Sequence, residues 1–147
     1  MLDDLYNRRI LELAGNIART GRLAHADGSA TAHSKLCGST VTVDVALDGD
    51  VVSDYAQDVK ACALGQASSA ILANHVVGAK IGDLRALRTA VTAMLKADGP
   101  APGGVWADFA VLEPVRAFKH RHASTLLVLD AVEKAIDQAL AKRGVAA

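Results

Sequence analysis

The sequence predicts a single α+β domain, residues 1–147, in which helices pack on one face of a small antiparallel sheet. Three observations predict it. A chain of 147 residues can bury roughly two-thirds of its unfolded surface in one core. Apolar residues alternate with polar ones over residues 39–47 and recur at helical spacing before and after the hairpin that they begin. No internal repeat divides the chain.

Composition constrains the core and the partners. Hydrophobic residues make up 51% of the chain but aromatic ones only 3%, so the core must be built from small side chains and closely packed helices. The 16 basic and 16 acidic residues balance, and no basic block is interleaved with aromatics. We therefore expect neither nucleic acid nor an anionic membrane as a partner.

The sequence also predicts a compartment. No apolar run approaches the roughly 18 residues of a membrane span, and no signal-peptide core follows the N-terminus. The two cysteines lie far apart, so we expect a cytoplasmic protein with free thiols, although one disulfide is formally compatible with the sequence.

The first expected element is a helix. Asp3 and Asp4 lie where the helix dipole favours negative charge, and an apolar stripe continues to about Thr20, before Gly21 ends it. This helix fits either a core element or a docking arm for a partner.

A hairpin follows. Residues 28–35 are small and polar and predict a loop or a weak edge strand. Residues 39–47 alternate valine or leucine with polar residues, which predicts a half-buried strand. Residues 48–50 read Asp-Gly-Asp, a tight-turn signal, and residues 51–55 then return as the second arm.

The rest of the chain predicts only helices, from apolar residues at helical spacing and from capping and breaking residues between them. The expected features, in chain order, are a helix after Cys62 ended by Gly78, a helix capped by Asp83, a loop over residues 99–104, a core re-entry at Trp106, Phe109 and Leu112, a short helix over residues 114–121 and a terminal helix capped by Ser124 or Thr125 that runs to about Arg143.

Cys62 lies at or just before the first turn of one of these helices. Backbone N–H groups are unpaired in a first turn and the dipole is positive there, which favours a thiolate. Cys62 is therefore a candidate for sulfur or metal chemistry. Taken alone, the same pattern also fits a small buried residue at the start of a core helix.

A second thiol, Cys37, precedes Gly38, which allows the backbone to turn sharply. The predicted hairpin between Cys37 and Cys62 folds back and brings the two thiols together. A third cluster, residues 119–124, precedes the last helix and brings imidazole nitrogens or a hydroxyl to the same place. Cysteine with histidine suits zinc or iron. The third cluster also fits a solvated basic turn with Ser124 as an N-cap.

Together these motifs resemble the iron–sulfur cluster assembly scaffolds of the IscU/NifU N-terminal type, and within them the SufU branch. Residues 98–112 are similar to the insertion that marks this branch, and the resemblance extends from the first helix to Arg143. The family's three cysteine sites are similar, in order, to Leu36-Cys37-Gly38, to Cys62-Ala63-Leu64 with Ala67-Ser68, and to Val115-Arg116-Ala117-Phe118 with Arg121 leading to Ser124.

Two of the family's four usual ligand positions are substituted. Ser39 stands where the family has aspartate, and Ser124 stands where it has its third cysteine. A neutral serine is a poor ligand for zinc or ferrous iron beside thiolate, imidazole or carboxylate. His122, two residues before Ser124, is a candidate replacement ligand, and His33, four residues before Cys37, is another. Mixed cysteine and histidine ligation is known for [2Fe–2S] clusters.

The resemblance implies an iron–sulfur cluster assembly scaffold that accepts sulfur from a cysteine desulfurase and delivers clusters to acceptor proteins. Cys37 and Cys62 are then the persulfide acceptors and the ligands of iron or a transient [2Fe–2S] cluster, with His122 and Ser124 as further metal ligands. A second interpretation is an enzyme, a zinc-dependent sulfurtransferase of SufU type. A third is a metal-free docking or regulatory partner of the assembly machinery. We expect a monomer or a weak oligomer.

Overall fold

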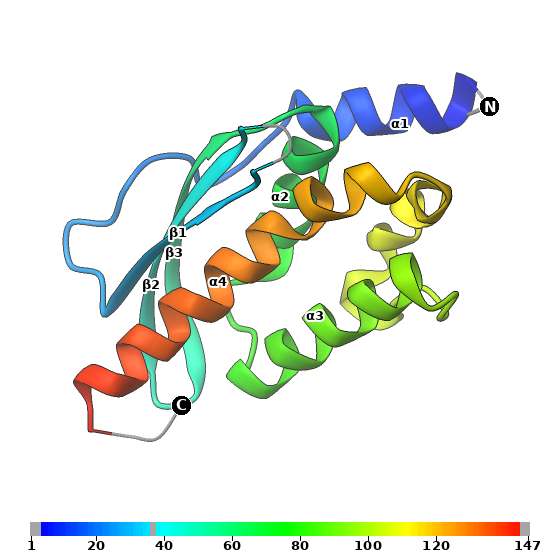
Figure 1. Ribbon diagram of the computed structural model, residues 1–147. Coiled ribbons are helices and arrows are strands. Elements are labelled where there is room, and N and C mark those ends of the chain that lie inside the picture. Colours follow the sequence, from blue (N-terminus) through cyan, green and yellow to red (C-terminus); the bar gives the residue numbers. More distant parts are fainter. Residues whose placement is uncertain (1–3, 36–37, 145–147) are drawn as a thin grey trace.

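The computed structural model describes residues 4–35 and 38–144. Its elements confirm the predicted α+β order of a helix, antiparallel strands and then only helices (Figure 1). They are α1 (Asp4–Ala14), β1 (Gly28–His33), β2 (Thr40–Asp48), β3 (Val51–Lys60), α2 (Ala63–His75), α3 (Ile81–Lys96), the 3-10 helices η1 (Gly104–Ala117) and η2 (Lys119–Arg121), and α4 (His122–Lys142).

The three strands form an antiparallel sheet in the order β1-β2-β3. The predicted tight turn joins β2 to β3, and Gly49 supplies the φ of 62° that it requires. The small polar segment before Cys37 forms the edge strand β1. β3 continues past the predicted end at Tyr55, because Tyr55 and Gln57 are buried against the helices and keep pairing with β2.

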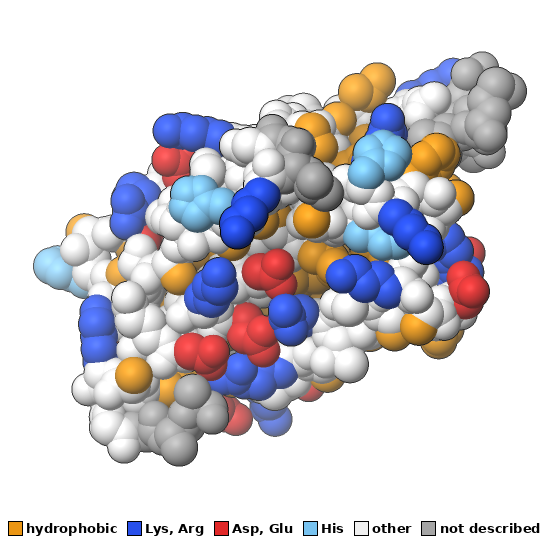
Figure 2. All heavy atoms as spheres, viewed as in Figure 1, with side chains coloured by type: hydrophobic (Ala, Val, Ile, Leu, Met, Phe, Trp, Pro, Cys, Tyr) orange, Lys and Arg blue, Asp and Glu red, His pale blue; other side chains and the backbone are white. Residues whose placement is uncertain are grey.

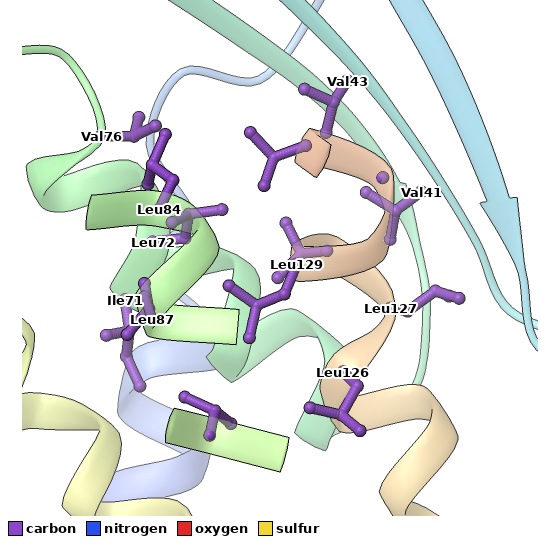
Figure 3. Packing of buried hydrophobic residues seen from close by; sticks show 14 of the residues in the cluster. Val41, Val43, Ile71, Leu72, Val76, Leu84, Leu87, Leu126, Leu127 and Leu129 are labelled. Carbon is purple, nitrogen blue, oxygen red and sulfur yellow. The ribbon is translucent and has the colours of Figure 1, made fainter. Parts of the chain in front are cut away.

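α4 is the central element of the core. It packs against β1 and β2 on one side and against α2 and α3 on the other (Figure 1). Figure 3 shows Val41 and Val43 of β2 on one side of α4 and Leu72, Leu84 and Leu87 on the other. Residues 126–129 are therefore all buried, whereas a helix on the surface buries only one stripe.

Small residues bring β1 close to α4. A Cβ at Gly28 would collide with the carbonyl oxygen of Ala135 and lie 2.9 Å from the backbone nitrogen of Ala139. The backbone N–H of Ser29 donates to Oε1 of Gln138 at 2.7 Å and fixes the same contact. This packing agrees with the expected core of small side chains.

α1 ends at Ala14, not near Thr20 as the apolar stripe predicted. Gly15 is a poor helix former. The Asn16 side-chain amide donates to the carbonyl of Glu12 at 2.7 Å and satisfies one of the free acceptors at the helix end.

The residues that follow pair with β3. The Gln57 N–H donates to the Arg19 carbonyl and the Gly21 N–H donates to the Gln57 carbonyl, each at 2.9 Å. The Gln57 side-chain amide also donates to the carbonyls of Ala18 at 3.1 Å and Ser69 at 3.2 Å. This tertiary pairing, rather than a helix, satisfies the backbone after residue 16.

The linker then crosses the sheet face opposite the helices and is anchored there by Asp44. The buried Asp44 carboxylate accepts hydrogen bonds from Arg22 Nε at 2.7 Å, Ser29 Oγ at 2.6 Å and the Leu23 N–H at 3.0 Å. Burial raises the pKa of Asp44, but these donors and the charge of Arg22 outweigh burial and hold the pKa below its ordinary value.

Two predicted helix caps are wrong. Asp83 lies inside the first turn of α3 instead of capping it. α4 begins at His122 with Arg121 at the N-cap position, so Ser124 and Thr125 lie inside its first turn. Their hydroxyls donate back to the Arg121 carbonyl, which is the bond that serine and threonine make within helices.

The segment before α4 is a longer helix than expected, and of another type. η1 is a 3-10 helix over 14 residues with Pro114 inside it. Its buried residues recur every third position, at Trp106, Phe109, Leu112 and Val115, as expected for three residues per turn.

Ion pairs line the surface between α3 and α4. Arg85 Nη2 lies 2.7 Å from Asp137 Oδ1, and Arg88 Nε lies 2.8 Å from Asp130 Oδ1 and 3.1 Å from Glu133 Oε2. Figure 2 shows acidic and basic side chains alternating along this line. Beneath them, one cluster of buried apolar side chains extends from α1 to α4.

No helix among the described residues is long and apolar enough to cross a membrane.

Candidate functional site

Cys62 lies between the end of β3 and the first residue of α2. Its φ of −68° and ψ of 173° place it at the N-cap position with extended backbone, and its carbonyl accepts the N–H of Gln66 at 2.9 Å. Its side chain makes no capping hydrogen bond, and the residue is exposed. The thiol is therefore free to react, next to first-turn N–H groups that favour negative charge.

Ser124 is the neighbour of this thiol. The distance between Cys62 Sγ and Ser124 Oγ is 3.5 Å, within hydrogen-bonding range for sulfur. Ser124 is buried in the first turn of α4, so its hydroxyl reaches the thiol from the protein side. The structure thus brings together two residues that the sequence separates by almost half the chain.

The Cys62 thiol donates to Ser124 Oγ, and the Ser124 hydroxyl itself donates to the backbone. It donates to the carbonyl of Arg121 at 3.2 Å, and Thr125 Oγ1 donates to the same carbonyl at 2.9 Å. If the Ser124 hydroxyl turns toward a thiolate at Cys62, Thr125 still satisfies the Arg121 carbonyl. The hydroxyl can therefore serve the sulfur without leaving a buried acceptor unpaired.

Gly65 allows this contact between α2 and α4. A Cβ on Gly65 would lie 2.8 Å from the Cβ of Ala61 and 3.2 Å from the carbonyl oxygen of Ser124. Any larger residue at position 65 would push the first turn of α4 away from Cys62. The sequence did not point to Gly65, since a glycine near a helix start carries no distinctive signal, and it pointed to Thr125 only as a candidate helix cap.

The loop that precedes β2 lies at the same end of the sheet. Thr40 pairs with Lys60, so β2 begins and β3 ends at the same end of the sheet. Gly38 has a φ of 72°, as the predicted sharp turn requires, and Ser39 is buried. Cys37, the other predicted site cysteine, lies outside the described residues.

His122 faces backbone carbonyls. The side chain is buried, and its Nε2 lies 3.1 Å from the carbonyl oxygen of Val115 and 3.2 Å from that of Arg116. Two acceptors around one ring nitrogen require that nitrogen to carry the proton, so it has no lone pair for a metal. In this arrangement only Nδ1 of His122 is left as a ligand atom.

The other predicted nitrogen ligand, His33, ends β1 and is exposed. Within residues 4–35 and 38–144, no three or more His, Cys, Asp or Glu side chains are grouped to hold a metal ion. Of the predicted site residues that are described, the structure pairs Cys62 with Ser124 and directs one nitrogen of His122 to the backbone.

Comparison with known proteins places this geometry in a family. The model of the NifU-like N-terminal domain matches residues 5–143. A crystal structure of a nitrogen-fixing NifU-like protein (N-terminal) from Brucella abortus is 58% identical, with a TM-score of 0.92, over 95% of this chain and 97% of that one. No curated protein matches this sequence.

More distant structures share the fold. A putative iron–sulfur cluster assembly scaffold protein for the SUF system from Fervidobacterium islandicum AW-1 is 20% identical, with a TM-score of 0.80, over 87% of this chain and 93% of that one. A hypothetical protein is 21% identical, with a TM-score of 0.82, over 92% and 99%. The family model and the 58% identity together show that this chain belongs to the NifU-like N-terminal domain family.

Proposed function

We propose that this chain is an iron–sulfur cluster assembly scaffold that receives sulfur and iron as cargo at Cys62 and Cys37. Membership of the NifU-like family supports the class of function. The observation that carries the site is an exposed thiol at the start of α2, hydrogen-bonded to the buried hydroxyl of Ser124. The sulfur donor in this proposal is a cysteine desulfurase, and the recipients are downstream acceptor proteins.

Sulfur transfer requires an accessible nucleophile. The Cys62 thiolate attacks the outer sulfur of a persulfide on the desulfurase cysteine. The sulfur–sulfur bond of the donor breaks as the new one forms on Cys62, and the donor cysteine leaves as a thiolate, so no net oxidation occurs. The exposure of Cys62 permits this approach. Ser124 Oγ, 3.5 Å away, accepts from the neutral thiol, and its hydroxyl turns to donate to the sulfur when the sulfur carries negative charge.

In this proposal, the side chains of one chain provide fewer than the usual four strong ligands for the iron cargo. Thiolates are good ligands for iron, whereas the hydroxyl of Ser124 and that of Ser39 are poor ones. Cys37 and Cys62 then provide the two strong ligands of one chain. A cluster held by few strong ligands leaves readily, which suits a protein that must pass it on.

The test is cluster assembly on purified protein without oxygen. Ferrous iron, L-cysteine, a cysteine desulfurase and dithiothreitol, which reduces persulfide sulfur to sulfide, are added, and visible absorbance follows cluster formation. We expect cluster absorbance to develop on the parent protein and to be lost in Cys62→Ser and in Cys37→Ser. The control is Ser53→Ala, which changes an exposed residue of β3 far from Cys62 along the strand.

Other outcomes separate the alternatives. Stable binding of zinc alone, with sulfur transferred to Cys62 but no cluster formed, would identify a sulfurtransferase instead. If neither cysteine carries metal or sulfur after the assay, the proposal is contradicted. The docking-protein interpretation then remains. Equal cluster yield in the parent and Cys62→Ser would remove Cys62 from the site.

A further inference from the structure

A cavity of about 520 Å³ lies where the end of α3, the end of η1 and the start of α4 meet. Its lining residues are Leu95, Lys96, Asp98, Arg116, Lys119 and His122. In Figure 2, Lys, Arg and His side chains gather over this end of the molecule. The volume falls in the range of small-molecule sites, which is roughly 300–1,000 Å³.

The charges around the cavity are unbalanced. Lys96, Arg116 and Lys119 are cations, and Asp98 is the only carboxylate among the lining residues. Asp98 is 87% exposed, and its Oδ1 lies 3.7 Å from Arg116 Nη1, too far for a hydrogen bond. Neither lysine has an ion pair among the described residues. An exposed carboxylate at this distance neutralises little of the cavity's positive charge.

Arg116 has unused hydrogen-bonding capacity. Its Nη2 donates to the Gly99 carbonyl at 3.0 Å, which holds the guanidinium in place. Its Nε is buried and has no hydrogen-bond partner. Glu113 lies 3.8 Å from Nη2, again beyond hydrogen-bonding distance. A buried N–H without an acceptor is costly, and a guanidinium matches the paired oxygens of carboxylate and phosphate.

His122 fixes the cavity wall. Because its Nε2 donates to the carbonyls of Val115 and Arg116, it holds the backbone that carries the guanidinium. The neighbouring Arg121 is engaged elsewhere, since its guanidinium carbon lies 5.4 Å from the ring centre of Phe118. Lys119, by contrast, lines the cavity.

We propose that this cavity binds a small free dianion, phosphate or a short dicarboxylate. Lys96 and Lys119, neither of them ion-paired among the described residues, and the partly exposed guanidinium of Arg116 line a space of matching size. The inference is independent of the proposed function, because it uses neither Cys62 nor a metal. Ser124 and His122 lie two residues apart in the first turn of α4, so the cavity and Cys62 adjoin the same turn.

The test is a titration of the full chain with anions at constant ionic strength, monitored through the amide chemical shifts in NMR spectra. Sodium phosphate and sodium succinate are the probes, and sodium chloride is the reference. We expect saturable shifts at residues 96–99 and 116–122 with phosphate or succinate and none with chloride. Linear, unsaturated shifts, or the same shifts with chloride, would overturn the proposal.

Variants decide whether the binding belongs to this cavity. The double variant Lys96→Gln/Lys119→Gln should weaken binding at least tenfold. Its control, Lys134→Gln/Lys142→Gln, removes the same charge from exposed positions of α4 and should leave binding within twofold of the parent. Arg116→Lys, which keeps the charge but not the guanidinium, should also weaken it. Equal weakening by both double variants would mean that net charge alone attracts the anion and would overturn the site.

Discussion

The thiol of Cys62 has a hydroxyl as its neighbour, and this determines what the residue pair can do. A hydroxyl donates a hydrogen bond to a thiolate or a persulfide, but it is a weak ligand for iron or zinc. The 3.5 Å contact with Ser124 therefore supports sulfur chemistry better than tight metal binding. Replacing that hydroxyl by a thiol should reverse the balance.

Ser124→Cys should bind zinc at least tenfold more tightly than the parent, because a second thiolate would stand beside Cys62. Competition with a chromophoric chelator measures the affinity. Ser53→Cys is the matched control, because it adds a thiol at an exposed position near the other end of β3. Equal gains in the two variants would show that Ser124 does not adjoin the metal.

His122→Ala should lower the free energy of unfolding by about 2–3 kcal/mol, because it leaves a cavity and removes the donor to two backbone carbonyls. Urea unfolding measures this, with the exposed His120→Ala as the control. Zinc affinity of the folded variant should also fall, because the contacts of Nε2 leave Nδ1 available as a ligand atom. Unchanged stability would contradict the buried contacts of His122, and unchanged zinc affinity would remove His122 from the expected ligands.

At the residue scale the sequence predicts the types of group at the site but not their geometry. Cys62 at a helix start followed from helical periodicity alone, and Ser124 from its place in a family pattern. The burial of His122 against Val115 and Arg116 depends on how η1 meets α4, which no local pattern encodes. The sequence likewise does not predict that two hydroxyls share the Arg121 carbonyl, because that contact also depends on where α4 begins.

Among the elements, the contact between the first turns of α2 and α4 positions Cys62. Gly65→Ala should destabilise the fold by about 1–3 kcal/mol through overpacking, although alanine favours helices by about 1 kcal/mol. A Cβ there would lie 2.8 Å from that of Ala61. Thermal and urea unfolding measure the change.

Gly82→Ala is the control for this variant. Gly82 lies in the first turn of α3, and a Cβ there would meet nothing within 4 Å. That substitution should stabilise the protein by about 0.5–1 kcal/mol. The same sign of change at both glycines would contradict the close approach of α2 and α4.

Stability should also depend on pH through the linker that crosses the sheet. The pKa of Asp44 is lower in the folded state than the ordinary value of about 3.9, so its stabilising effect is complete above about pH 5 and is lost as pH falls below about 4. Asp44→Asn should flatten the fall in unfolding free energy between pH 5 and pH 3. Asp48→Asn, at the exposed end of β2, should keep the slope of the parent. If the unfolding free energy of Asp44→Asn falls with pH as steeply as that of the parent, this carboxylate does not hold the linker.

Element types were predictable where a pattern repeats, and element ends were not. The alternation before the Asp-Gly-Asp turn gave β2, and helical spacing gave α2 and α4. The ends of α1 and β3 are decided by the pairing of Gln57 with Arg19 and Gly21, residues far apart in the chain. Tertiary hydrogen bonds of this kind override local propensity.

Across the whole molecule, one buried cluster joins α1 to α4, which predicts a single cooperative unit. Trp106 is the only tryptophan and lies in the core beside Phe109. Its fluorescence should therefore lose its native value at the same urea concentration as far-UV circular dichroism, within about 0.1–0.2 M. Separate midpoints would divide the predicted single domain into two folding units.

The most direct test of the scaffold assignment is the content of iron, zinc and acid-labile sulfide in protein that is purified and then loaded with iron and sulfide without oxygen. We expect iron with an equal amount of sulfide, and the loss of both in Cys62→Ala. Absence of any metal, with both thiols free in the parent protein, would contradict the scaffold assignment.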